Sequence, residues 1–420
     1  MKSATDFLNK HLVPTLTVLS ENTYLSAIRA GMVSVVPLTI IGGLFMVLAE
    51  FPVAAWTEFI APWHQLLEYP FKATFGLLAV FVSFAIGYDL GARFKLDPLS
   101  SASIATLVFL LLQLHLVPGE EPVIALNTEG LGSNGLFTAI VVALICVRVQ
   151  KFFTDRNLVI KLPASVPAVV YESFLSLIPM CVLVLVFWGI RFGLGVDINH
   201  QVQLLFKPLV FALNTLPGIL VYAFCVTLLW SVGINGDNAM DAVVAPVFLA
   251  GLMANAEAMN AGQPLTNITA LGFFTTFVNV GGTGATIALA LVMINSKEPG
   301  FRKVSRLSLP TQIFQINEPI FFGFPIVLNP IFMMPYILNA LILTASTYLL
   351  MDWGIIQKPF VNVPWTTPPI IGHYLVSGGD WRAAVWGVIS IVLAMAIYYP
   401  FAKVAERQRL KAEAEGKAHE

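Results

Sequence analysis

The sequence predicts an all-α polytopic membrane protein, with about ten transmembrane helices and one or two re-entrant hairpins. Of its 420 residues, 57% are hydrophobic and only 11% are charged. Soluble domains carry about 25% charged residues, so this chain has too few to cover an aqueous surface. Its mean hydropathy is +0.80 and its net charge is −1, and neither value suggests nucleic-acid binding.

Apolar stretches near the ~20 residues needed to cross a bilayer recur along the whole chain. They lie at about 28–49, 71–91, 98–117, 135–153, 172–193, 209–231, 239–259, 269–295, 311–328, 330–351 and 383–401. Lys and Arg concentrate on the cytoplasmic side of membrane proteins, which sets their orientation. The basic stretches are Lys2 with Lys10, 148–161, 297–306 and 403–411, and they predict that both termini lie inside.

The number of crossings between these basic stretches predicts a hairpin. Eight crossings connect the inner N-terminus to the inner stretch at 297–306 if the runs 209–231, 239–259 and 269–295 all cross, and three apolar runs remain before the basic tail. One of the three must enter and leave on the same side, and the proline-interrupted run at 311–328 is the best candidate. The proline-rich window 359–376 is a candidate for a second hairpin.

The polar stretch at 194–208 divides the chain into two halves. We expect a scaffold and dimerisation half at 1–195, and a substrate-binding and transport half at 196–402. Residues 403–420 form a charged cytoplasmic tail. The polar motifs that stand out within apolar sequence are concentrated in the second half.

The strongest of these motifs surrounds Glu318, within the stretch Gln315–Gly323. A carboxylate in an apolar run is expensive at membrane depth and is by default a functional-site hypothesis. We expect Glu318 to be withdrawn from bulk water, where it can accept a hydrogen bond or a proton from a hydroxyl. The structural alternative is a carboxylate that pins the hairpin by bonding to backbone amides.

Two further clusters combine glycine with polar side chains, at 230–238 and 280–286. Glycine permits unusual backbone dihedrals and close approach of a ligand. The first cluster is equally consistent with a polar helix cap, and the second with a helix-packing face. The residues expected to contact substrate are Asn235, Asp237, Gly282, Thr283, Asn317, Glu318, Trp365 and His373. The alternative for Trp365 is a tryptophan at the membrane interface, and the alternative for His373 is a structural role in a loop.

The residues alone predict a transporter with a site for a polar and neutral solute. Amide, hydroxyl, glycine and tryptophan candidates around one carboxylate suit a sugar better than an ion. No metal-binding spacing, phosphate-binding loop or nucleophile motif is present, so we expect neither a metal nor a cofactor. An intramembrane enzyme with Glu318 as general base is the least favoured alternative, because no nucleophile or metal ligand is close to it in sequence.

Four segments resemble the membrane-embedded IIC component of the bacterial phosphotransferase system, in its lactose/cellobiose/diacetylchitobiose family. They are 160–167, the Gly-Ile-Asn-Gly motif at 233–236, 281–286 and 314–319. The similarity spans nearly the whole chain, and the last segment is highly specific. It implies a permease in the bacterial cytoplasmic membrane that forms a homodimer through its N-terminal half. It also implies an elevator-like movement of the C-terminal half and its hairpins.

In that family the glutamate that matches Glu318 contacts the sugar hydroxyl that becomes phosphorylated, which makes it the candidate catalytic residue. The phosphoryl donor is a phosphocysteine on a IIB protein, supplied by IIA and, through HPr and Enzyme I, by phosphoenolpyruvate. We expect IIA and IIB to be separate proteins here, so the chain is the membrane subunit of a phosphotransferase complex. A β-linked disaccharide is the expected substrate, and a proton- or sodium-coupled sugar transporter is the alternative.

Two positions depart from the family pattern. Asn235 stands where histidine is usual, and asparagine can donate and accept hydrogen bonds but cannot titrate near neutral pH. Sugar binding can therefore survive while proton handling at this position does not. Thr283 replaces the usual serine and keeps the hydroxyl.

Overall fold

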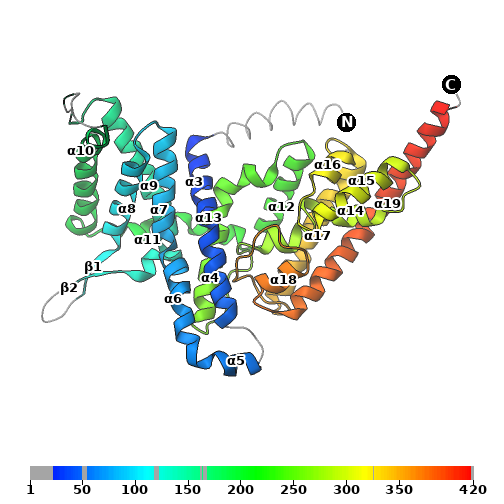
Figure 1. The fold of residues 1–420 in the computed structure, drawn as a ribbon, viewed down its shortest axis with the longest axis horizontal. Helices are drawn as coiled ribbons and strands as arrows, with labels where there is room; N and C mark the ends of the chain where they lie inside the picture. Colours follow the sequence, from blue (N-terminus) through cyan, green and yellow to red (C-terminus); the bar gives the residue numbers. More distant parts are fainter. Residues whose placement is uncertain are drawn as a thin grey trace.

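The computed structural model describes residues 22–49, 54–117, 123–160, 163, 168–324 and 326–417. Within these ranges the protein is almost entirely helical (Figure 1). The strands found there form one antiparallel hairpin of β1 (Leu114–Val117) and β2 (Val123–Leu126). The all-α class is therefore confirmed, whereas the orientation signals at Lys2 and Lys10 lie outside the described residues.

Among the helices that precede residue 195, α7 lies against α3, α8 and α9, whereas α10 packs on α8 and α9, and α4 packs on α6 (Figure 1). Glycine allows this close approach: Gly31 of α3 receives the side chain of Ile86, and Gly87 of α7 lies against Ala102 of α8. Small residues serve this purpose in membrane helix pairs generally. The helices are α3 (Thr23–Ser34), α4 (Val36–Ala49), α5 (Ala54–Ile60), α6 (His64–Thr74), α7 (Leu78–Arg93), α8 (Pro98–Gln113), α9 (Leu136–Asp155) and α10 (Ala168–Trp188).

A sharp bend separates the next two helices, α11 (Ile198–Leu213) and α12 (Leu216–Ser231), whose axes differ by 78°. The bend follows from local chemistry. The Thr215 hydroxyl caps α12 by accepting a hydrogen bond from the Gly218 N–H, and Pro217 occupies the first turn, where its missing N–H costs nothing. Because this cap and proline start a new helix at Leu216, α11 and α12 do not form one straight helix.

The remaining helices build a second group in which α14 and α17 pack against α19, and α12 packs against α17 (Figure 1). These are α13 (Gly236–Asn260), α14 (Ile287–Met293), α15 (Pro299–Gln312), α16 (Glu318–Gly323), α17 (Pro330–Asp352), α18 (Ile371–Val376) and α19 (Trp381–Lys417). Two short helical turns precede α14, at Phe273–Val278 and Thr283–Ala285.

The described residues contain seven helices long and apolar enough to span a membrane, or nine if each of two bent pairs counts as one span. The protein is thus a multi-pass membrane protein, although these helices do not establish the expected count of ten. The interruption of the run 311–328 is confirmed, because α15 ends at Gln312 and α16 extends only from Glu318 to Gly323. Pro325, part of that prediction, lies outside the described residues.

The run 269–295, one of the expected crossings, is a bent pair of helical pieces rather than one straight helix. Its two parts meet at an angle of 47°. Gly281, Gly282 and Gly284 all have positive φ, a conformation that other residues adopt only with strain and that cannot continue an α-helix.

A buried polar contact joins the first helices to the last third of the chain. The Asn362 side-chain amide donates a 2.6 Å hydrogen bond to the Thr39 hydroxyl of α4. Thr39 is fully buried and Asn362 is 8% exposed. Gly43, one turn along α4, lies against the Asn362 backbone, so a larger side chain there would separate the two segments.

Candidate functional site

Gln315 holds the glycine loop at 281–284 in place. Its side-chain oxygen accepts hydrogen bonds from the backbone N–H groups of Gly281 at 2.7 Å and Gly282 at 3.1 Å. Gln315 is 7% exposed and has a φ of 68°, so its backbone is held in the left-handed region. Buried backbone N–H groups need acceptors, and here one glutamine side chain supplies two of them.

Asn317 makes the second connection between the same two segments. Its amide nitrogen donates to the Thr283 hydroxyl at 3.1 Å and to the Thr286 hydroxyl at 3.0 Å. A Cβ atom at Gly282 would overlap the Asn317 side chain, which explains why glycine is needed there. Gly282, Thr283 and Asn317, three of the predicted site residues, therefore lie in direct contact.

Glu318 follows as the first residue of α16, and its side chain is exposed. The expectation that it is withdrawn from solvent is therefore wrong for this conformation. The broken backbone explains the difference, because α16 starts immediately after the Asn317 contact and turns the next side chain away from the protein interior. An exposed carboxylate beside a buried amide cluster remains available to a ligand hydroxyl.

The cluster at 230–238 lies beside α16. The Trp230 indole N–H donates to the Asp237 carboxylate at 2.8 Å, and the Trp230 ring packs edge-on against Phe321 of α16 with 5.3 Å between ring centroids. Asn235 caps α13 by accepting a 2.9 Å hydrogen bond from the Asn238 N–H. The helix-cap alternative weighed from the sequence is thus confirmed, and the exposed Asn235 side chain keeps its amide N–H groups free to donate.

The segment before α18 also reaches this region. The Gln315 side-chain nitrogen donates to the Thr367 carbonyl at 3.4 Å, so Gln315 joins its own segment to two others. Trp365 is 61% exposed, which leaves its ring face accessible.

His373 lies differently from the other candidates. Its side chain is fully buried, and its Nδ1 accepts a hydrogen bond from the Ile370 N–H at 3.3 Å. The ring packs edge-on against Phe277 at 4.6 Å and fills the space beside Gly387. In this conformation His373 has no surface from which to contact a solute.

The sequence did not single out two tyrosines that shape the glycine loop. The Tyr398 hydroxyl donates to the Gly284 carbonyl at 2.8 Å, and the Tyr336 ring occupies the space where a Cβ of residue 284 would lie. Both side chains are fully buried in apolar helices. Such tyrosines look like packing residues in a sequence, and only the fold brings them to the loop.

The chain is similar to known proteins over most of its length. Residues 29–340 match the family described as Phosphotransferase system, EIIC. The chain is 35% identical over 428 residues to the PTS system cellobiose-specific EIIC component of Geobacillus stearothermophilus, with 97% of this chain and 95% of the relative covered. It is 34% identical over 433 residues to the lichenan permease IIC component of Bacillus subtilis (strain 168), covering 98% and 96%. The crystal structure of ChbC, the IIC component from the N,N'-diacetylchitobiose-specific phosphotransferase system, superposes with a TM-score of 0.90 at 34% identity, covering 97% of this chain and 99% of ChbC.

Proposed function

Since this chain belongs to the EIIC family and is a sugar transporter of the phosphotransferase system, we propose that its substrate is a β-linked disaccharide of the cellobiose or chitobiose type. The names of its relatives support this class. The observation that carries the proposal is the set of contacts from Gln315 and Asn317, which brings a glycine loop with two hydroxyls beside the free carboxylate of Glu318.

We assign distinct roles to the residues of this site. Glu318 accepts a hydrogen bond from the sugar hydroxyl that becomes phosphorylated, and the free amide hydrogens of Asn235 donate to a neighbouring sugar oxygen. The Trp365 face stacks on an apolar sugar face. Asp237, held by Trp230, accepts from a further hydroxyl.

The remaining predicted residues shape the site. Gly282, Thr283 and Asn317 form its floor, with Thr283 presenting its hydroxyl to the ligand. His373 supports the neighbouring segment from within the core, since its buried ring leaves packing as its contribution in this conformation.

Phosphoryl transfer then occurs at the inner mouth of the site. The sugar hydroxyl oxygen forms a bond to the phosphorus of a phosphocysteine on a separate IIB protein. The phosphorus–sulfur bond breaks to leave a thiolate, while the hydroxyl proton passes to Glu318. IIA and, indirectly, HPr and Enzyme I restore the donor. Positioning and proton transfer are the contributions of this chain.

The transport cycle that we propose is an elevator-like displacement of 196–402 against 1–195, in a homodimer with about ten spans per protomer. The interrupted helices at α14 and α16 support re-entrant hairpins in the moving part. We place both termini on the cytoplasmic side of a bacterial inner membrane. The start of α3 and the end of α19 lie at the same edge of the molecule in Figure 1, which supports this orientation.

The test uses vesicles that contain this protein and labelled cellobiose or chitobiose. With IIA, IIB, HPr, Enzyme I and phosphoenolpyruvate supplied, we expect labelled sugar phosphate on the side of the relay, and none when IIB is omitted. Accumulation of free sugar driven by a proton or sodium gradient would instead support the coupled transporter, which the family match does not favour.

A further inference from the structure

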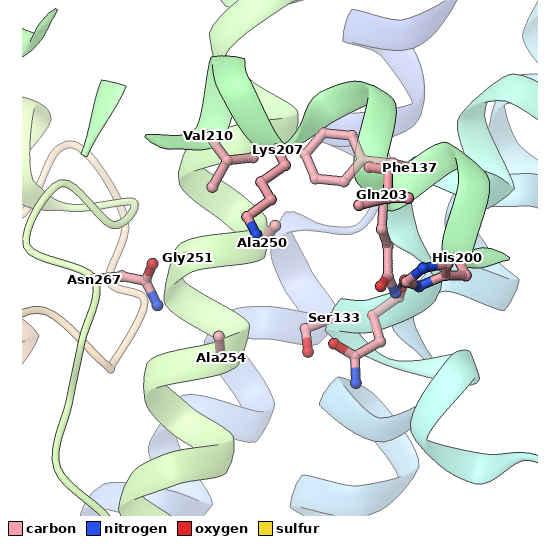
Figure 2. A pocket seen from close by; sticks show the side chains of 12 residues that line it. Ser133, Phe137, His200, Gln203, Lys207, Val210, Ala250, Gly251, Ala254 and Asn267 are labelled. Atoms are coloured by element: carbon pink, nitrogen blue, oxygen red, sulfur yellow. Dashed lines mark hydrogen bonds between the residues drawn. The ribbon is translucent and has the colours of Figure 1, made fainter. Parts of the chain in front are cut away.

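A cavity of about 360 Å³ lies away from the sugar site, where α11 crosses α9 and α13 (Figure 2). Its wall on α13 is formed by Ala250, Gly251 and Ala254. At 1.5 Å per residue, this wall lies about 20 Å along α13 from Asp237. The cavity is therefore a separate feature of the molecule, and the proposed function makes no use of it.

The lining is apolar on one side and cationic on the other. Phe137 of α9 and Val210 of α11 face the small residues of α13. Lys207 and His200 come from the polar side of α11, and Figure 2 shows the Lys207 side chain extending from α11 toward Ala250. No acidic residue is among those that line the cavity within the described parts of the chain.

The nearest carboxylates are engaged elsewhere. Asp197, which caps α11, pairs with Arg191 at 3.4 Å and accepts a hydrogen bond from the backbone N–H of His200. Glu257 lies behind the cavity wall and accepts from the hydroxyl of Ser133 at 2.7 Å. Within the described residues, no ion pair or hydrogen bond occupies the Lys207 amine, so this exposed lysine gives the cavity a positive charge without a carboxylate partner.

The surface of α11 also indicates what reaches this charge. The 78° bend separates α11 from the direction of α12. The α11 side chains Leu205 and Phe211 are 73% and 71% exposed, as expected for residues of a membrane protein that face acyl chains. Lysine amines attract anionic lipid headgroups.

We propose that this cavity binds one anionic phospholipid per protomer. The phosphate contacts the Lys207 amine, with His200 and Gln203 beside it, and an acyl chain lies along Phe137 and the small residues of α13. The cavity suits a lipid because its cationic side can meet the headgroup while its apolar side meets the acyl chains. It is lined by helices from both parts of the chain, so the lipid bridges α9 and α13.

The experiment measures lipid binding to the full-length protein in nanodiscs of phosphatidylcholine, with and without phosphatidylglycerol. A fluorescent phosphatidylglycerol should bind saturably, with one molecule per protomer. Phosphatidylcholine should displace it poorly. Lys207→Gln removes the charge and should weaken binding about fivefold. Ala254→Leu fills the apolar side while keeping the lysine, and it should also weaken binding.

The matched control is Lys72→Gln, which removes an exposed lysine of α6 that already pairs with Glu68. Binding to this variant should equal that of the parent protein. Equal binding of both lipids, or an unchanged affinity in Lys207→Gln and Ala254→Leu, would overturn the proposal. Full displacement by inorganic phosphate or glycerol phosphate would show a site for a soluble anion instead.

A second copy of the chain could fill the same cavity, and a cysteine variant distinguishes this case from a bound lipid. In a protein with Cys181 and Cys225 replaced by serine, Ala254→Cys should react with a membrane-permeant maleimide, and phosphatidylglycerol should protect it from this reaction. Cross-linking of Ala254→Cys to another protomer in the absence of lipid would show that the cavity is a protein interface, and would overturn the proposal. None of these measurements requires sugar transport, so their outcome is independent of the proposed function.

Discussion

The side-chain oxygen of Gln315 accepts a 2.7 Å hydrogen bond from the backbone N–H of Gly281, 34 residues earlier in the chain. The same oxygen accepts from the next N–H, and the side-chain nitrogen reaches a third segment. One buried side chain therefore determines the relative positions of the glycine loop, the Glu318 segment and the segment of Trp365.

Gln315→Met roughly keeps the volume but leaves the buried Gly281 N–H without its acceptor, whereas the Gly282 N–H keeps its hydrogen bond to the Asn279 carbonyl. An unsatisfied buried group costs about 1–3 kcal/mol, so we expect a lower unfolding midpoint and a large loss of sugar affinity. Thermal unfolding and sugar-binding titrations measure the two effects. Gln408→Met, at an exposed position of α19, is the control and should change neither. Parent-like sugar affinity in Gln315→Met would show that the loop holds its shape without this side chain.

Glu318→Gln should nearly abolish coupled phosphorylation, because an amide cannot take the hydroxyl proton. The side chain is exposed, so the free energy of unfolding should change by no more than about 0.5 kcal/mol. The measurement is sugar phosphate formed by vesicles of matched protein content. Activity close to that of the parent protein would remove Glu318 from the proposed mechanism.

Asn235 caps α13, and we propose that it also contacts sugar; substitutions can separate these two roles. Asn235→Ala removes both and should cost about 1 kcal/mol of stability, whereas Asn235→Ser keeps a capping oxygen and should be near parent stability. If the amide contacts sugar, both variants lose affinity. Asn235→His restores the usual family residue and should retain transport. Misfolding of Asn235→His, or unchanged affinity in the serine variant, would leave only the structural role.

Gly282→Ala should be among the most damaging single substitutions in the site. The added Cβ overlaps Asn317, and the φ of 105° strains any residue other than glycine. Overpacking and strain together predict a loss of about 2–4 kcal/mol, measured as a fall in unfolding midpoint. Gly189→Ala is the matched control, because nothing lies within 4 Å of the added atom. Equal midpoints for the two variants would contradict the packing described here.

The environment of Asp380, in the turn before α19, predicts that the protein loses stability in acid. Burial alone would raise the pKa of its carboxyl, but hydrogen bonds from Arg382 and from the Gln357 N–H more than offset this and lower the pKa below its usual 3.8. A lowered folded-state pKa stabilises the protein above the unfolded pKa, and the contribution is lost as pH falls through the folded value. Unfolding midpoints measured across the acid range should fall less steeply in Asp380→Asn. Identical slopes would show that other carboxyls dominate.

Local signals in the sequence predicted much of this fold. Pro319 and its neighbours predicted the interruption of 311–328, and the polar cluster with glycines on both sides of Asn235 predicted a helix cap as one alternative. The composition predicted the membrane class. Each of these rests on chemistry that acts within a few residues along the chain.

The parts that the sequence did not predict depend on contacts between distant segments. Whether His373 faces a cavity or the core is decided by Phe277 and Gly387, which belong to other segments. The exposure of Glu318 depends on where α16 begins, and Tyr398 reaches Gly284 across 114 positions. No periodicity in the sequence reports such contacts.

The buried bond between Asn362 and Thr39 has a kinetic consequence. Any sliding of α4 past the segment 359–363 must first separate this amide from its hydroxyl, in surroundings that offer no water to either. Each group then bears a desolvation cost of about 1–3 kcal/mol. In the elevator-like cycle that we propose, a movement of α4 past this segment would have to break this contact, and the cost would slow that movement.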